Sequence, residues 1–224
     1  MRRRFLFLLV VMLALAFGQT NKVDVVTTVG AIDSGQAQVE VTLNNGTAHS
    51  VTAWVWQVKG TYPDGSTQAH GGTIDLLGAT DNQGPIDFRP GSNYQFPSFL
   101  PVVNGSAPTK VTATLPLVVF DDDTATGDPQ MIRRFGAARK AMADMEAEEF
   151  AEIEAALKAP SPKDALVAAI GTRKANHKSD GNMQQILVLL KYNVARENID
   201  YAISVLRQHQ ILKAAHTNLR SEVN

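Results

Sequence analysis

The acidic run in the middle of the chain is the first place where side chains could do chemistry. Asp121, Asp122 and Asp123 follow an apolar stretch directly, and Asp128 stands a few residues later. Carboxylate oxygens at such spacing are ligands that Ca²⁺ takes from protein loops. An EF-hand loop that begins at Asp122 would need a glutamate where Arg133 stands, so that motif is excluded. Two interpretations remain: a looser calcium site, and the one we expect, a solvated turn whose acids favour the start of the following helix.

The histidines show no spacing that suits a metal ion. They are His49, His70, His177, His209 and His216. His209 and His216 are seven positions apart, which separates them by about 10.5 Å along a helix. Two ligands of one ion need about one helical turn between them, and no HExxH sequence is present. We therefore expect surface histidines or histidines between helices.

A glutamate-rich segment is the third candidate. Its members are Glu146, Glu148, Glu149, Glu152 and Glu154. Paired carboxylates act as general acids and bases, and Glu-x-x-His pairs hold iron in helical bundles. No histidine follows any of these glutamates at that spacing. The segment therefore predicts a charged helix face that opposes basic partners.

The sequence predicts no catalytic, cofactor-binding or metal-binding residue. It contains no GxSxG, SxxK or phosphate-loop motif. It contains no cysteine, which excludes disulfides, zinc fingers, thiol nucleophiles and a lipoprotein anchor. Asn45-Gly46-Thr47 and Asn104-Gly105-Ser106 match the glycosylation sequon, and their use depends on the source of the protein.

The first residues carry an export signature. Three arginines at positions 2–4 precede an apolar run over 5–17, and Ala16-Phe17-Gly18 places small residues where signal peptidase requires them. A membrane span needs about 20 apolar residues, so the run is short for an anchor. We predict a signal peptide over 1–18, cleavage before Gln19 and a periplasmic or secreted protein. Membrane attachment is expected only if the segment stays uncleaved.

Alternating residues predict an antiparallel β-sandwich over 21–122. The clearest strand is 37–43, whose apolar and polar residues alternate, and Asn44-Asn45-Gly46 is a hairpin signal. The returning strand places Trp54 and Trp56 on one face, so we expect at least one tryptophan in the core. Pro116 in the last strand predicts an edge or a bulge. Further strands are expected over 22–29, 73–77, 86–88, 94–99 and 110–120.

This strand pattern resembles an immunoglobulin-like or fibronectin-like sandwich. The likeness rests on about seven short strands separated by turns, with a tryptophan on a middle strand. The stretches NNGTAHSVTAW, YPDGS, RPGSNYQF and VVFDDDTATGD are also similar to exported bacterial sandwich proteins of unknown function. The resemblance implies a fold and a location, and it implies no activity.

Residues 128–222 change to a helical period, so the predicted fold class is α+β. Asp128 suits an N-cap and Pro129 the first helical position of one long amphipathic helix that ends at Leu157. Two to three shorter helices are expected over Pro162–Ala175 and 183–219, with a break at 193–198. Tyr201, Val205, Leu212 and Leu219 form one apolar stripe there. Because 121–157 is acidic and 158–224 basic, we expect the later helices to fold back on the long one.

These features favour a non-enzymatic binding or assembly module over an enzyme. The expected partner is a protein, or a second copy that associates through the helical region. Nucleic acid is not expected, because the basic residues are spread along the tail and form no concentrated patch. The alternative is an enzyme or small-ligand carrier with a site between the sandwich and the helices. A concave pocket with converging polar groups would favour that alternative, and a flat apolar helical face would favour interaction.

Overall fold

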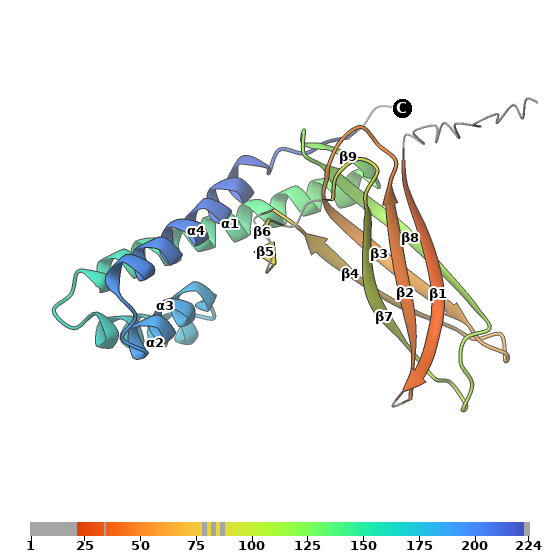
Figure 1. Ribbon diagram of the computed structural model, residues 1–224, viewed down its shortest axis with the longest axis horizontal. Helices are drawn as coiled ribbons and strands as arrows, with labels where there is room; N and C mark the ends of the chain where they lie inside the picture. Colours follow the sequence, from red (N-terminus) through yellow and green to blue (C-terminus); the bar gives the residue numbers. More distant parts are fainter. Residues whose placement is uncertain (1–21, 34, 78–79, 82–83, 86–87, 222–224) are drawn as a thin grey trace, which may run out of the picture.

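The computed structural model describes residues 22–33, 35–77, 80–81, 84–85 and 88–221. Two facing sheets form one end of the molecule, and four helices leave it as a long arm (Figure 1). The predicted α+β class is therefore confirmed, with two mainly antiparallel sheets of eight strands in all and four helices. The predicted signal peptide lies outside the described residues.

The first sheet has the order β1-β2-β7, and both of its pairings are antiparallel. Its strands are β1 Val23–Asp33, β2 Gln36–Asn45 and β7 Asn93–Pro101.

The second sheet has the order β10-β9-β8-β3-β4, and its β10–β9 pair is parallel. Its strands are β3 Val51–Thr61, β4 Thr67–Asp75, β8 Lys110–Phe120, β9 Thr124–Gly127 and β10 Arg220–Ser221. A separate ribbon pairs β5 Thr80–Asp81 with β6 Gly84–Pro85.

Both tryptophans lie in the core between the sheets. Trp54 is 0% exposed and Trp56 is 8% exposed, so the expectation of at least one buried tryptophan is confirmed for both. Trp54 packs edge-on to Tyr94, with ring centroids 4.8 Å apart. Trp56 faces Gly72 across the β3–β4 pair, where a Cβ atom would come within 3.1 Å of the indole. The glycine therefore makes room for the large ring.

The predicted irregularity at Pro116 is a bulge in β8. The register runs from Val55↔Leu117 to Gln57↔Thr114, so β8 uses one residue more than β3. Gly127 of β9 lies against the bulge with φ 127°, and a Cβ atom there would overlap the Pro116 carbonyl oxygen. Only glycine fits this close approach.

The helices begin and end close to the predicted positions. They are α1 Pro129–Leu157, α2 Pro162–Ala175, α3 Gly181–Lys191 and α4 Arg196–Ala215, and together they form the helical arm. Asp128 caps α1 as predicted, because its Oδ1 accepts the N–H of Gln130 at 2.7 Å and of Met131 at 2.9 Å. Asn193, at the predicted break, has φ 52° between α3 and α4.

The arm has an apolar core of its own, and a smaller apolar cluster joins it to the sheets. Phe150 and Ile153 of α1 pack with residues of the other three helices at the far end (Figure 1). At the near end, Ile132 packs on Ala53, Leu117, Val119 and Ala125, which lie outside the main core. The arm is thus a packed bundle attached to one face of the second sheet.

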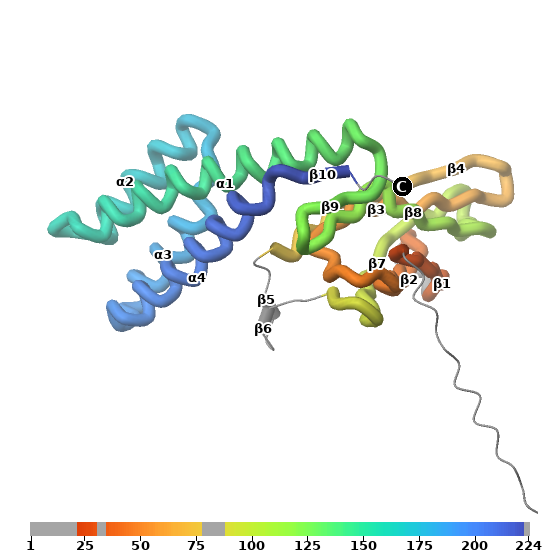
Figure 2. Tube along the Cα trace, turned by 90° about the horizontal axis from the view of Figure 1, so that it is seen from above, coloured from red at the N-terminus to blue at the C-terminus, as the bar shows by residue number. Residues whose placement is uncertain are grey.

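The later helices fold back on α1, as the charge distribution predicted. α4 runs beside α1 towards the sheets, and β10 then joins β9 (Figure 2). Ion pairs join Lys178 to Glu148, Arg207 to Glu154 and Lys213 to Glu146. The second sheet therefore continues past residue 122 and includes a strand from the end of the chain. Independent folding of 21–122 stays a prediction.

None of the described helices combines the length and the apolar character that a membrane crossing requires.

Candidate functional site

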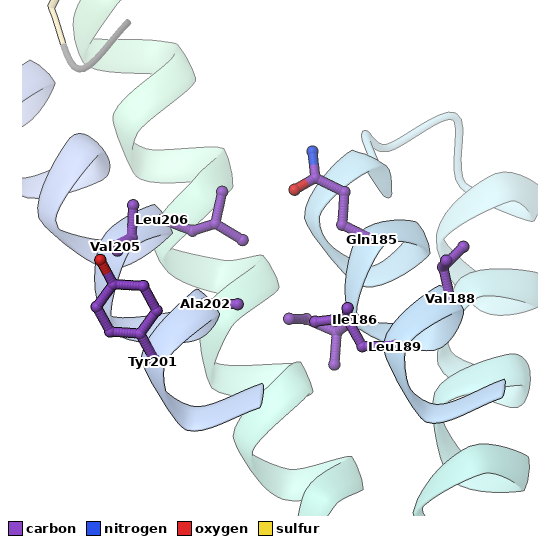
Figure 3. A pocket seen from close by; sticks show the side chains of 8 residues that line it. All are labelled: Gln185, Ile186, Val188, Leu189, Tyr201, Ala202, Val205 and Leu206. Atoms are coloured by element: carbon purple, nitrogen blue, oxygen red, sulfur yellow. The ribbon is translucent and has the colours of Figure 1, made fainter. Parts of the chain in front are cut away.

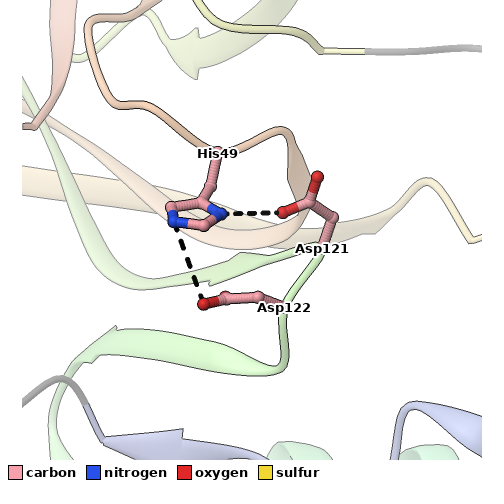
Figure 4. Close-up of side chains that lie close together, drawn as sticks. All are labelled: His49, Asp121 and Asp122. Atoms are coloured by element: carbon pink, nitrogen blue, oxygen red, sulfur yellow. Dashed lines mark hydrogen bonds and ion pairs between the residues drawn. The ribbon is translucent and has the colours of Figure 1, made fainter.

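The acidic turn, Asp121–Asp123, connects β8 to β9 and meets the β2–β3 loop. His49 Nδ1 lies 3.2 Å from Asp121 Oδ1, and its Nε2 lies 3.9 Å from Asp122 Oδ2 (Figure 4). These three side chains offer metal-ligand atoms within 4.8 Å of one another. Asp128, considered with them from the sequence, instead caps α1. The sequence alone gave no sign of His49, because a hairpin and a strand pairing bring it to the turn.

The acids of this turn already have protein partners. Partial burial by itself raises the pKa of the Asp122 carboxyl, but hydrogen bonds from Thr124 N and Oγ1 outweigh it and hold the pKa below its ordinary value. Asp123 Oδ1 lies 2.8 Å from His216 Nδ1. Arg220 donates to the backbone oxygens of Asp122 and Asp123. The turn therefore joins the β2–β3 loop to the residues that follow α4.

One glutamate of the acidic segment departs from the predicted charged face. Glu149 is 1% exposed, and its carboxylate accepts the N–H of Met183 at 2.8 Å and the amide of Asn182 at 3.0 Å. It thereby caps α3, whose own N-cap Asp180 makes no side-chain cap bond. Burial raises its pKa, against the opposing effect of those bonds. The other four glutamates pair with basic residues, as expected: Glu146, Glu148, Glu152 and Glu154.

The two sequons differ in their surroundings. Asn45 is buried, and its Nδ2 donates to the carbonyl oxygens of His49 and Phe88, each at 2.9 Å. Asn104 lies on the surface, where its Nδ2 donates to Asp64 at 3.3 Å. Asn104 is therefore the accessible amide of the pair.

An apolar groove, here called the arm groove, runs between α3 and α4 at the far end of the arm. Its volume is about 470 Å³. The lining residues are Gln185, Ile186, Val188, Leu189, Tyr201, Ala202, Val205 and Leu206. Figure 3 shows Ile186 and Leu206 directed towards each other across it. Tyr201 is 71% exposed, although the sequence placed it on an apolar stripe. The residues of α4 that pack in the arm core belong to a neighbouring stripe, which includes Ile199 and Ile203.

A second cavity, here called the junction pocket, lies where the arm leaves the sheets. Its volume is about 390 Å³. It is lined by Thr73 and Asp75 of β4, by Phe135, Ala138, Arg139 and Met142 of α1, and by Lys213 of α4. This is the location that the alternative small-ligand prediction named. None of its lining residues was a site candidate from the sequence, because β4, α1 and α4 are far apart along the chain.

The comparisons with known proteins found no relative. The chain matches no protein-family model, no curated protein and no solved structure. Its own contacts are therefore the basis on which a function can be inferred.

Proposed function

We propose that this protein is an exported, non-enzymatic assembly module, in which an immunoglobulin-like sandwich carries a helical arm that docks a protein partner in the arm groove. The arm groove is the observation that carries this proposal. It is almost wholly apolar, with Gln185 and the Tyr201 hydroxyl as its polar groups. Grooves of this kind take the apolar face of an amphipathic helix.

The partner that best fits the arm groove is a second copy of the same chain. The arm carries exposed apolar side chains: Val188 and Tyr201 line the groove, and Tyr192, Ile211 and Leu212 lie elsewhere on the arm. The arm therefore has both a hollow and exposed apolar side chains that a second copy would cover. A two-fold axis brings the same patch of two copies together, so a surface that is self-complementary in this way forms closed dimers.

The way in which the arm is attached to the sheets supports a docking role. The arm core holds the four helices together, and the contacts of His216 and Arg220 attach the end of α4 to the acidic turn. α3, which forms one side of the groove, lies at the end of the arm remote from the sheets (Figure 1). A rigid support reduces the conformational entropy that association costs.

Strand order supports the immunoglobulin-like part of the proposal. In that family strands A, B and E share one sheet, and strands C, F and G share the other. With β1, β2 and β7 as A, B and E, the second sheet supplies β3, β8 and β9 as C, F and G. Trp54 then occupies the buried tryptophan position on strand C. Export is supported by the arginines at 2–4 and the apolar run over 5–17.

Sedimentation of residues 19–224 tests the docking proposal. We expect a monomer–dimer equilibrium that is populated at about 100 µM or below, a typical range for modest interfaces. Val205→Glu places a charge in the groove and should give a monomer with unchanged circular dichroism. Ala168→Glu, at an exposed position of α2, is the matched control and should dimerise like the original chain. A chain that stays monomeric at that concentration, or a Val205→Glu variant that still dimerises, would overturn the proposal.

A further inference from the structure

We infer that the junction pocket binds a small amphipathic monoanion, a carboxylate with a short apolar chain. This site is separate from the arm groove and does not depend on it. The volume of about 390 Å³ falls within the range of about 300–1,000 Å³ that small-molecule pockets occupy. Its walls come from one strand and two helices, so the pocket forms only when the arm is packed on the second sheet.

One wall of the junction pocket is apolar. Phe135, Ala138 and Met142 of α1 lie at successive turns of the helix and line one side. Methionine adapts its shape readily, and Met142 is exposed at the surface, where a chain could enter. This wall suits an aliphatic segment a few carbons long.

Arg139 is the reason to expect that the ligand of this pocket is an anion. Its side chain is 3% exposed. Its Nε and Nη2 donate to Asp75 Oδ2 and Oδ1 at 2.8 and 2.9 Å, and its Nη1 donates to the His216 oxygen at 3.2 Å. A guanidinium has five N–H groups, and these bonds use three. No acceptor among the described residues takes the other two. A buried donor without an acceptor is costly, and a carboxylate oxygen would satisfy it.

Lys213 supplies the second cation. Its Nζ lies 2.8 Å from Glu146 Oε1, and both side chains are partly exposed. Glu146 does not line the pocket, so the lining charges are Arg139 and Lys213 against Asp75 alone. The lining itself carries one net positive charge, which the Glu146 carboxylate balances from 2.8 Å. A monoanion would therefore bind through the spare N–H groups of Arg139 and of the Lys213 ammonium, whereas a dianion such as phosphate would add repulsion from the carboxylates of Asp75 and Glu146.

Octanoate is a suitable probe, and the test uses residues 19–224 with NMR-observed methionine methyl groups. Octanoate should shift the Met142 methyl resonance saturably, with a Kd of about 1 mM or tighter, a range typical of weak small-ligand binding. Octanol has the same chain without the charge, and octylammonium has the opposite charge. Both should bind at least about tenfold more weakly, which corresponds to about 1.4 kcal/mol.

Variants separate the junction pocket from unspecific apolar binding. Lys213→Met should weaken octanoate binding about tenfold and leave octanol binding unchanged. Met142→Trp should fill the entrance and abolish both, as measured by titration calorimetry because this variant lacks the Met142 methyl group. Lys140→Met, which removes an exposed cation of α1 that pairs with Asp144, is the matched control and should have no effect. The inference is overturned if octanol binds as tightly as octanoate, if Lys213→Met retains full octanoate affinity, or if no saturable shift occurs.

Discussion

His216 Nδ1 lies 2.8 Å from Asp123 Oδ1, and this contact attaches the end of α4 to the turn between β8 and β9. The backbone of the same histidine accepts a hydrogen bond from Arg139, whose guanidinium also holds Asp75 of β4. Residues 216–221 therefore form a C-terminal return that connects the arm to the second sheet. The arm is held at the start of α1 and again at the end of α4.

Gly136→Ala should loosen the C-terminal return. A Cβ atom at Gly136 would lie 2.6 Å from the Thr217 carbonyl oxygen, so the return must move away from α1. We expect a loss of about 1–3 kcal/mol in the free energy of unfolding, the usual cost of overpacking. Urea denaturation measures the loss, and hydrogen exchange should show faster opening at residues 216–221.

Gly171→Ala is the matched control for that variant. It lies inside α2, and a Cβ atom there meets nothing within 4 Å. Alanine is the better helix former, so this variant should gain about 0.5–1 kcal/mol. If both variants behave alike, the contact between α1 and the C-terminal return does not constrain Gly136.

Phe150→Asp should unfold the arm and leave the sheets folded. Phe150 is buried in the arm core, whose apolar residues come from all four helices. Both tryptophans lie between the sheets, so their fluorescence reports on that part alone. We expect circular dichroism to lose helix signal while tryptophan emission stays blue-shifted.

High salt provides the complementary measurement on the arm. Each exposed ion pair contributes only about 0–1 kcal/mol and weakens with salt. About 1 M NaCl should therefore change the helix content little. If salt melts the helices and Phe150→Asp does not, the charges rather than the apolar core hold the arm together.

Glu149→Gln should change how stability depends on pH. Burial raises the pKa of Glu149 in the folded protein, so the folded state holds the proton more tightly than the unfolded chain. Its contribution is therefore fully present below the unfolded pKa and is lost as pH rises through the folded pKa. We expect the original chain to lose stability relative to Glu149→Gln over that rise, measured by urea denaturation between about pH 4 and 7.

Glu148→Gln should show the opposite sign. The hydrogen bond and charge of Lys178 lower the pKa of the exposed Glu148, so its contribution is present above the unfolded pKa and is lost as pH falls. The original chain should therefore lose stability relative to Glu148→Gln on acidification. Parallel pH profiles for the two variants would show that burial does not distinguish Glu149.

The sheets should fold without the arm. Among the described residues, the main core draws on β1, β2, β3, β4, β7 and β8 and on Leu76 and Phe88, all before residue 121. The fragment 21–122 should therefore unfold cooperatively in urea, as followed by tryptophan fluorescence. The fragment 21–127 should be more stable, because it retains the pairing of β9 with β8. If neither fragment shows a cooperative transition, the sheets require the arm.

Local signals in the sequence were sufficient to place most elements. Asp128-Pro129 and Ser161-Pro162 begin helices at the predicted residues. Asp128 caps α1 with its side chain, whereas Ser161 makes no side-chain cap bond and the geometry of Pro162 favours the start of α2. The alternation over 37–43 likewise gave the buried face of β2 correctly. These interactions are short in sequence and need no knowledge of the rest of the fold.

The sites depend on contacts that are distant in sequence, and those were not predicted. Arg139 and Asp75 are 64 positions apart, and His216 and Asp123 are 93 apart. Helical period alone also failed to choose between the two apolar stripes of α4. The period placed Tyr201 on the predicted apolar stripe, but Tyr201 is exposed. Ile199 and Ile203 face the arm core instead, because the position of α1 decides which stripe is buried.

The arm is a lever. Its longest helix has 29 residues, which corresponds to about 44 Å at 1.5 Å per residue. A rotation of about 10° at the end held by Ile132 and His216 would therefore move the far end by about 8 Å. The arm also transmits force in the other direction. A force applied at the arm groove produces a large torque on the few contacts beside β9, because the arm is long. A pull along β9 and β10 loads the hydrogen bonds between them in shear, because those bonds run across the strands.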